Sequence, residues 1–252
     1  MERDPRELGG AWQLSQRHTF IAPSGDLARY VERYWVVTWD YERPYRQLVA
    51  PLPNVHLTFR DGRAELHGPS SAHVHRELTG SGSVFGVAFR PGMFGPFLDG
   101  PVANLRDRVI DATTVFGPPL PDPVDVVSVE RFLRAHLPVD DPAAENAART
   151  VAMIAEDTGI TTVDALARRR GTSVRGMQRL FAEYVGIGPK WVIRRYRLQE
   201  VTVRLAQGLE IDWAALAADL GYADQPHLSR DFRKIFGEPP THYAQRYESS
   251  GK

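Results

Sequence analysis

Two predicted helices in the second half of the chain each carry arginine and glutamine on one face. The polar positions are Arg175, Gln178 and Arg179 in the first helix and Gln225, Ser229, Arg230 and Arg233 in the second. Apolar residues recur at spacings of three and four on the other face, which predicts that this face is buried. Arginine donates two hydrogen bonds to O6 and N7 of guanine, and glutamine pairs similarly with adenine. These two polar faces are therefore suited to contacting the edges of DNA bases, although an ordinary solvent-exposed helix face has the same composition.

A second group consists of histidines in the first half of the chain. His73, His75 and Glu77, with His67 upstream, have the residue types of a cupin-like site for iron, manganese or zinc. Glu77 follows His75 by two positions, whereas cupin-like sites place the glutamate four or five positions on. Ordinary strand histidines are therefore favoured, and a cupin-like metal-dependent enzyme domain on His73 and His75 stays as an alternative.

Other catalytic and cofactor patterns are missing from the sequence. There is no Ser-His-Asp pattern, phosphate-binding loop or dinucleotide fingerprint. The 252 residues include no cysteine, which excludes disulfides, iron-sulfur clusters and thiol nucleophiles. We therefore predict no catalytic residue, no metal and no cofactor.

Charge and hydropathy argue against a membrane partner. The first ten residues are mixed in charge, and the most apolar local run, Tyr34 to Trp39, covers six residues, so a cytoplasmic protein is expected. The 31 basic residues balance the 31 acidic ones. The segment 160–200 nevertheless has nine basic residues against three acidic ones, a local net charge of +6 that favours a polyanion.

Two textures divide the chain. Residues 1–120 have short apolar runs broken by turn residues, with Asp61-Gly62 as a hairpin signal, and predict a mainly-β domain built as a partial barrel or a sandwich. A short helix is expected over Asp26–Arg33. Residues 121–158 predict a helical connector after a proline-dense segment, and residues 159–252 an all-α domain. The expected fold class is therefore α+β with two domains.

The all-α part contains two copies of a helix-turn-helix pattern. In the first copy Thr162 and Ser173 are placed to cap two helices, and Gly171 separates them. In the second copy Gly221 and Gly237 end the two helices. Between the copies, residues 189–206 predict one long helix of roughly 27 Å, of the order of the roughly 34 Å between successive major-groove faces of B-DNA.

These units resemble the DNA-binding domain of the AraC/XylS family of bacterial transcription regulators. The resemblance rests on LARRRGTSVRGMQRLFAEYVGIGPKWV, on RYRL and on ALAADLGYADQPHLSRDFRKIFGEPPTHY. It implies that Arg175, Gln178, Arg179, Gln225, Ser229 and Arg230 lie at the DNA, with Arg233 and Thr241 near phosphates. Ala223 departs from the family, which usually has a small capping hydroxyl there, and Pro226 and Val201 depart as well. The second unit is also net acidic, so the first is expected to dominate affinity.

The amino-terminal domain has an aromatic cluster that could hold an effector. Tyr34, Trp35, Trp39 and His56 are the candidate ligand-binding residues for a small apolar or planar molecule, and burial in the core is the competing interpretation. This region also resembles a sensory or dimerising domain often found before the AraC-type module. The expected function is sequence-specific regulation of transcription on double-stranded DNA, controlled by a small-molecule effector or by homodimerisation. RNA polymerase would be a partner of an activator, and a constitutive DNA binder is the alternative.

Overall fold

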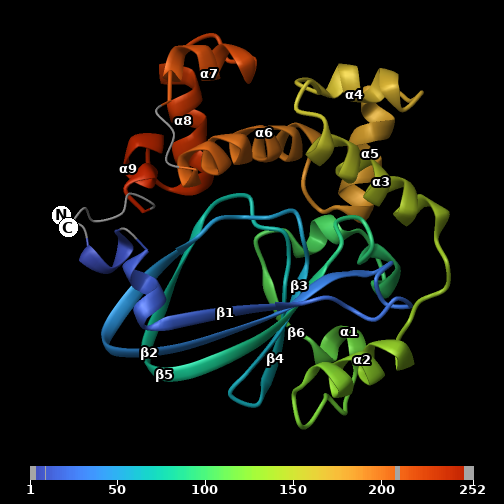
Figure 1. Cartoon of the computed structure of the whole chain (residues 1–252). Helices are drawn as coiled ribbons and strands as arrows, with labels where there is room; N and C mark the ends of the chain where they lie inside the picture. The colour runs from blue at the N-terminus through green and yellow to red at the C-terminus, as the bar shows by residue number, and fades with distance from the viewer. Residues whose placement is uncertain (1–3, 9, 208–210, 247–252) are drawn as a thin grey trace.

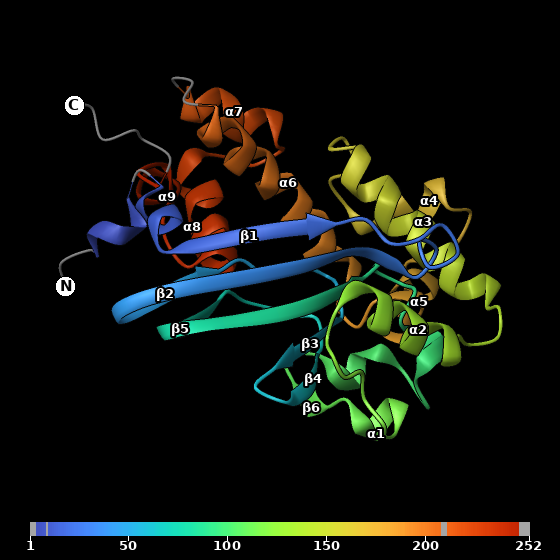
Figure 2. The ribbon, with the colours of Figure 1, turned by 60° about the horizontal axis from the view of Figure 1, so that its bottom comes forward.

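Residues 4–8, 10–207 and 211–246 are described in the computed structural model of the chain (Figure 1). Their amino-terminal strands form one antiparallel sheet with the order β1-β2-β5-β3-β4-β6. Figure 2 shows β1, β2 and β5 side by side along this sheet. The strands are β1 (Gln16–Ile21), β2 (Val31–Val49), β3 (His56–Arg60), β4 (Arg63–His67), β5 (Val74–Phe89) and β6 (Val109–Asp111).

Alternating burial and one tight turn build the middle of this sheet. Leu57 and Phe59 of β3 are buried, whereas Arg60 is exposed, as the period of two requires. Asp61 and Gly62 join β3 to β4 with φ values of +52° and +71°, the left-handed conformation that a two-residue hairpin turn needs. The predicted hairpin is confirmed, and because the described strands form one sheet, the sandwich alternative is wrong.

The predicted helix over Asp26–Arg33 is wrong. Residues 25–30 form turns, and β2 begins at Val31, which pairs with Phe89 of β5. The run of aromatic and β-branched residues after Tyr30 favours a strand, and pairing with β5 extends that strand back to Val31.

Short helices surround the sheet. They are the 3-10 helices η1 (Pro5–Glu7), η2 (Ala11–Leu14), η3 (Gly95–Phe97) and η4 (Val102–Leu105), and the α-helix α1 (Thr113–Phe116). The main amino-terminal core lies on one face of the sheet and includes Tyr34, Leu57, Leu66 and Phe89.

Two helices follow in the predicted connector and pack on different cores. Helix α2 (Val126–Ala135) places Val129 and Leu133 in the core of the sheet domain. Helix α3 (Pro142–Glu156) places Val151 and Ile154 against α5 and α6 in a second core. The boundaries at residues 120 and 158 stay a prediction.

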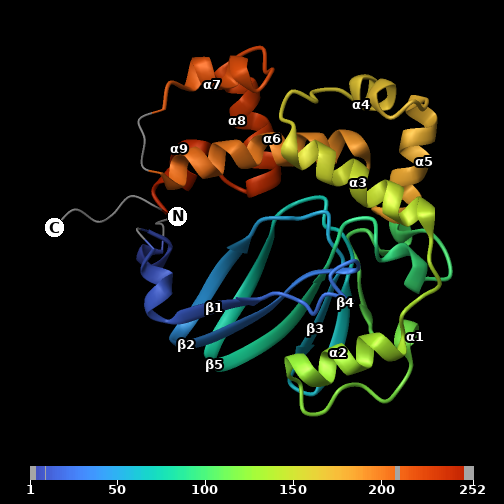
Figure 3. The same ribbon diagram turned by 45° about the vertical axis from the view of Figure 1, so that its right-hand side comes forward.

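The carboxy-terminal part is helical and is organised along one long helix. Its elements are α4 (Val163–Arg169), α5 (Val174–Tyr184), α6 (Pro189–Ala206), α7 (Trp213–Asp219), α8 (Gln225–Phe236) and α9 (Pro240–Ala244). The first half of α6 packs Val192 and Ile193 into the core shared with α3, α4 and α5. Its second half packs Leu198 and Val201 into a third core with α7 and α8. Figures 1 and 3 show these two helical units at opposite ends of α6. The predicted two-domain fold class is confirmed.

The sheet domain contacts the helical part along α6. The Trp191 indole donates to the carbonyl oxygen of Ser71 over 2.8 Å, and Arg195 Nε donates to that of Pro51 over 2.6 Å. Burial at this contact lowers the pKa of Arg195 to about 10, so the guanidinium stays charged at neutral pH. None of the helices in the described part of the chain is long and apolar enough to cross a membrane.

Candidate nucleic-acid interface

Helix α5 is fixed by its cap and by its buried face. The Ser173 hydroxyl accepts a hydrogen bond from the Gly176 amide over 3.0 Å, which satisfies one free donor at the start of the helix. Met177 and Phe181 are buried in the core shared with α3, α4 and α6. Gly171, with φ of +60°, lets the chain reverse between α4 and α5. The sequence thus places α5 as the second helix of a helix-turn-helix.

The opposite face of α5 presents the predicted base-reading side chains. Arg175, Gln178 and Arg179 are all exposed. Among the described residues, none of these three side chains forms a hydrogen bond or an ion pair within the protein. Their donors are therefore available to a ligand.

Helix α8 repeats this arrangement with a different cap. The Asp224 carboxylate accepts from the His227 amide over 2.7 Å, and Pro226 lies in the first turn, where its missing amide proton costs nothing. Leu228 and Phe232 are fully buried. Ala223 therefore leaves no helix end uncapped, because the next residue supplies the cap.

The outward face of α8 and the start of α9 carry the second set of predicted residues. The exposed ones are Gln225, Arg230, Arg233 and Thr241, and Ser229 is half-buried. Within the described ranges these five side chains make no hydrogen bond or ion pair to the protein. The structure thus gathers the predicted residues into two separate surface stripes, one on each unit.

Much of the positive charge in residues 160–200 is paired or buried inside the protein. Five of its arginines have partners inside the protein or are buried: Arg169 with Asp157, Arg170 with Asn146, Arg194 with Asp231, Arg195 with Pro51 and Arg197 over the Tyr222 ring. The other four basic residues, Arg168, Arg175, Arg179 and Lys190, are exposed. The local charge of +6 thus overstates what a polyanion would meet.

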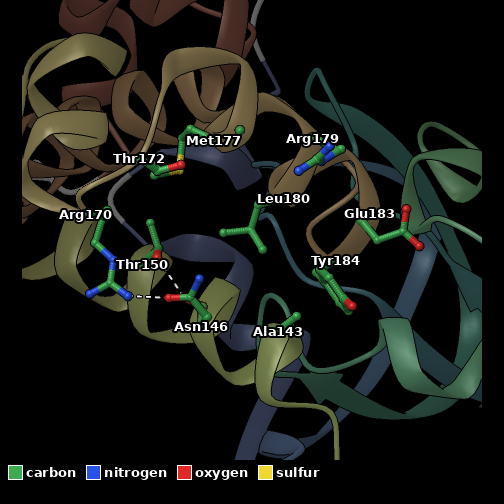
Figure 4. A pocket seen from close by; sticks show the side chains of 11 residues that line it. Ala143, Asn146, Thr150, Arg170, Thr172, Met177, Arg179, Leu180, Glu183 and Tyr184 are labelled. Carbon is green, nitrogen blue, oxygen red and sulfur yellow. Dashed lines mark hydrogen bonds between the residues drawn. The ribbon is translucent and has the colours of Figure 1, made fainter.

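A cavity of about 450 Å³ lies between α3 and α5, beside the reading stripe (Figure 4). Arg179 and Thr172 line it from the α5 side, and Asn146 and Thr150 line it from α3. Arg170 bonds to Asn146, so its guanidinium is held at this cavity. Arg170 and Arg179 thus line opposite sides of the same cavity.

The histidines of the alternative metal site point to different partners. His73 and His75 are neighbours, with ring centroids 5.6 Å apart. The His73 ring, however, packs against Gly237 and occupies the space that a side chain at that position would need. His67 bonds instead to the Thr58 hydroxyl over 2.9 Å. The residues that the structure describes include no group of three or more potential metal ligands.

The four candidate ligand residues divide into two pairs. Tyr34 and Trp39 are buried, the first in the main amino-terminal core and the second in a smaller cluster. The Trp35 indole lies over Gly86 and donates to His56 Nδ1 over 3.3 Å. Burial lowers the pKa of His56 to about 4, which keeps its ring neutral and able to accept this bond. A ligand at these residues stays a prediction.

Comparison with protein families identifies the helical part. Residues 166–246 match a family described as a helix-turn-helix domain, which spans both reading helices. The carboxy-terminal part of the chain is an AraC-type helix-turn-helix DNA-binding domain. The resemblance found in the sequence is confirmed for this part. Residues 19–111 match a domain of unknown function (DUF6597), which covers the sheet from β1 to β6.

Several solved structures are similar to this chain. The DNA-binding domain of AdpA in complex with a target DNA is 24% identical, over 44% of this chain and 100% of that one, with a TM-score of 0.35. An AraC-type regulator from Chromobacterium violaceum is 23% identical over 40% of this chain and 91% of that one, with a TM-score of 0.36. ToxT from Vibrio cholerae O395 is 11% identical over 95% of this chain and 100% of that one, with a TM-score of 0.42. A comparison with curated proteins found no match.

Proposed function

We propose that this chain is a transcription regulator that binds one DNA duplex sequence-specifically, with α5 and α8 in two major-groove faces. The supporting observation is that both helices expose arginine and glutamine without partners inside the described protein, at opposite ends of one helix. Arg175, Gln178 and Arg179 on α5, with Gln225, Ser229 and Arg230 on α8, would contact base edges. Arg233 and Thr241 would contact phosphates, which set affinity and its salt dependence.

Selection of binding sequences from random duplex DNA at two salt concentrations tests this proposal. We expect an enriched motif of two blocks about one helical turn apart, because each reading helix covers one groove face. A single block would mean that one unit reads bases. Binding without enrichment, lost at the higher salt, would contradict sequence-specific reading, since it would leave phosphate contacts alone.

The proposal includes control by a small-molecule effector in the sheet domain. A second cavity of about 720 Å³, within the usual size range of ligand pockets, is lined by Val36, Phe59 and Phe85 of the sheet. Leu120 and Val126, from the segment that leads into α2, line its other side. A ligand here would contact the sheet and the connector together. The initially predicted residues Tyr34, Trp35, Trp39 and His56 do not line this cavity and form a separate candidate.

A low-molecular-mass bacterial metabolite extract tests the effector. We expect it to change DNA affinity in the wild type and to lose this effect in Val36→Trp, because the larger side chain fills the cavity. Equal DNA affinity with and without the extract would support the alternative of a constitutive binder. The sheet domain would then act in homodimerisation, which sedimentation of the protein alone measures.

A cytoplasmic location and contact with RNA polymerase at activated promoters complete the proposal.

A further inference from the structure

The middle of α6 carries three arginines at the point where the helix passes from the first unit to the second. Arg194, Arg195 and Arg197 follow the residues that pack on α5 and precede those that pack on α8. Arg195 bonds to Pro51 of the sheet domain, and its guanidinium also lies over the Phe236 ring of α8. Arg194 and Arg197 turn to the second unit, so their role differs from that of a DNA-facing basic patch.

Arg194 forms an ion pair with Asp231 of α8. One guanidinium nitrogen, Nη2, lies 2.8 Å from Asp231 Oδ1 and 2.6 Å from Oδ2. The Asp231 side chain is only 9% exposed, and that of Arg194 is 33% exposed. Asp231 directly follows the predicted base reader Arg230, which is exposed. The carboxylate thus faces α6 while the neighbouring guanidinium faces outward.

Arg197 extends this contact to the turn of the second helix-turn-helix. Its guanidinium carbon lies 4.7 Å from the centre of the Tyr222 ring, and Nη2 lies close to where a side chain on Gly221 would project. Arg197 is buried, and its Nε and Nη2 have no hydrogen-bond partner among the residues that the structure describes. Asp231 also interacts electrostatically with Arg197, so its negative charge acts on two neighbouring guanidinium groups.

Charged hydrogen bonds add directional information that apolar packing lacks. The rest of the contact between α6 and α8 consists of the Arg195 guanidinium, 4.9 Å from the centre of the Phe236 ring, and of an apolar core that holds Leu198 and Val201 with Phe232 and Phe236. Apolar burial is nondirectional, so this core alone permits small rotations of α8. A buried carboxylate with a defined partner favours one arrangement, because any other leaves charge unpaired.

We propose that the Arg194–Asp231 pair fixes the angle of α8 relative to α5 and so determines the spacing between the two blocks that the regulator recognises. This inference rests on the proposed function, in which both helices read one duplex. Arg194 and Asp231 are positioning residues, since they act through Arg230 and its neighbours rather than on DNA. The consequence is a preference for one spacing that is separate from the preference for bases.

The test measures the affinity of the full-length protein for duplexes in which the two selected blocks are moved by one base pair in either direction. The wild type should prefer the selected spacing by about tenfold, comparable to the effect of one mismatched base pair. Asp231→Ala should reduce this preference to about twofold or less, and the isosteric Asp231→Asn, which preserves the shape of the core, should lie between. Affinity for a duplex with the first block alone should stay within about twofold of wild type in both variants.

The matched control is Arg204→Met, which removes another α6 arginine. Arg204 pairs with Glu200 of its own helix and lies 4.0 Å from Asp219 of α7, both at the surface. We expect it to keep the wild-type spacing preference. An unchanged spacing preference in Asp231→Ala would overturn the inference. Loss of binding to the second block at every spacing in Asp231→Asn would also overturn it, because the pair would then only stabilise the second unit. Absence of a two-block motif in the wild type would instead refute the proposed function.

Discussion

Replacing Arg179 by alanine is expected to weaken binding to the selected DNA site by about 1–3 kcal/mol and to relax the preference at one base pair. Arg179 is exposed in the middle of the α5 stripe and makes no hydrogen bond or ion pair to any described residue. The substitution should therefore leave the stability of the fold nearly unchanged and reduce the affinity for DNA. Titration of the selected duplex and of its single-base variants gives both the affinity and the relaxed position.

Arg233→Ala on α8 is the informative comparison for Arg179→Ala. Arg233 is also exposed, but we expect it at a phosphate. Its loss should weaken binding to all sequences by a similar factor and lower the slope of log K against log salt by about one. Arg17→Ala on the edge strand β1, an exposed arginine far from α5 in sequence, controls for net charge. Equal losses on selected and random DNA for Arg179→Ala would contradict base reading.

Local signals made the helical part predictable from the sequence. Ser173 and Thr162 cap helices as expected, and Gly171 adopts the positive φ that the turn needs. The long helix begins at Pro189 and ends at Ala206, as expected. Caps, glycine stops and apolar periodicity all act over a few residues, so a single sequence contains them.

Long-range pairing limited what the sequence could predict about the sheet domain. Asp26–Arg33 has the composition of a helix, but pairing of Val31 with Phe89 starts a strand inside it. The order that places β5 between β2 and β3 depends on contacts between residues far apart in the chain. The strand order has no local sequence signal, and the aromatic and β-branched run that favours β2 does not show at which residue its pairing begins.

The sequence predicted which residues of the candidate interface are exposed, but not how many of the nearby arginines are paired or buried inside the protein. Helical periodicity placed Arg175, Gln178 and Arg179 on one outward face, as the structure has them. The charge count included Arg194 and Arg197 but did not show that they are paired or buried inside the protein. Their partners, Asp231 of α8 and Tyr222, come more than 20 residues later in the chain. The spacing of Arg194 and Arg197 at three residues, on the apolar side of α6, was the available signal.

The two units should contribute unequally to binding, and core substitutions in each unit measure the difference. Phe181 and Phe232 are both fully buried, each in the core beneath its own reading helix. Truncation of a buried phenylalanine to alanine costs about 3–5 kcal/mol through lost apolar burial and the cavity that remains. Each substitution should therefore unfold or disorder its own unit, which chemical denaturation followed by circular dichroism detects.

We expect Phe181→Ala to reduce the affinity for the two-block site to that for random DNA, about a thousandfold or more. Phe232→Ala should retain first-block recognition and lose only the second block, because the second unit carries more acidic residues around its reading helix, such as Asp212, Asp219 and Asp224. Val127→Ala on α2, which is 66% exposed, should change neither stability nor affinity. Equal losses in Phe181→Ala and Phe232→Ala would contradict the dominance of the first unit. Binding would then require both helices at once, because neither stripe alone would hold the duplex.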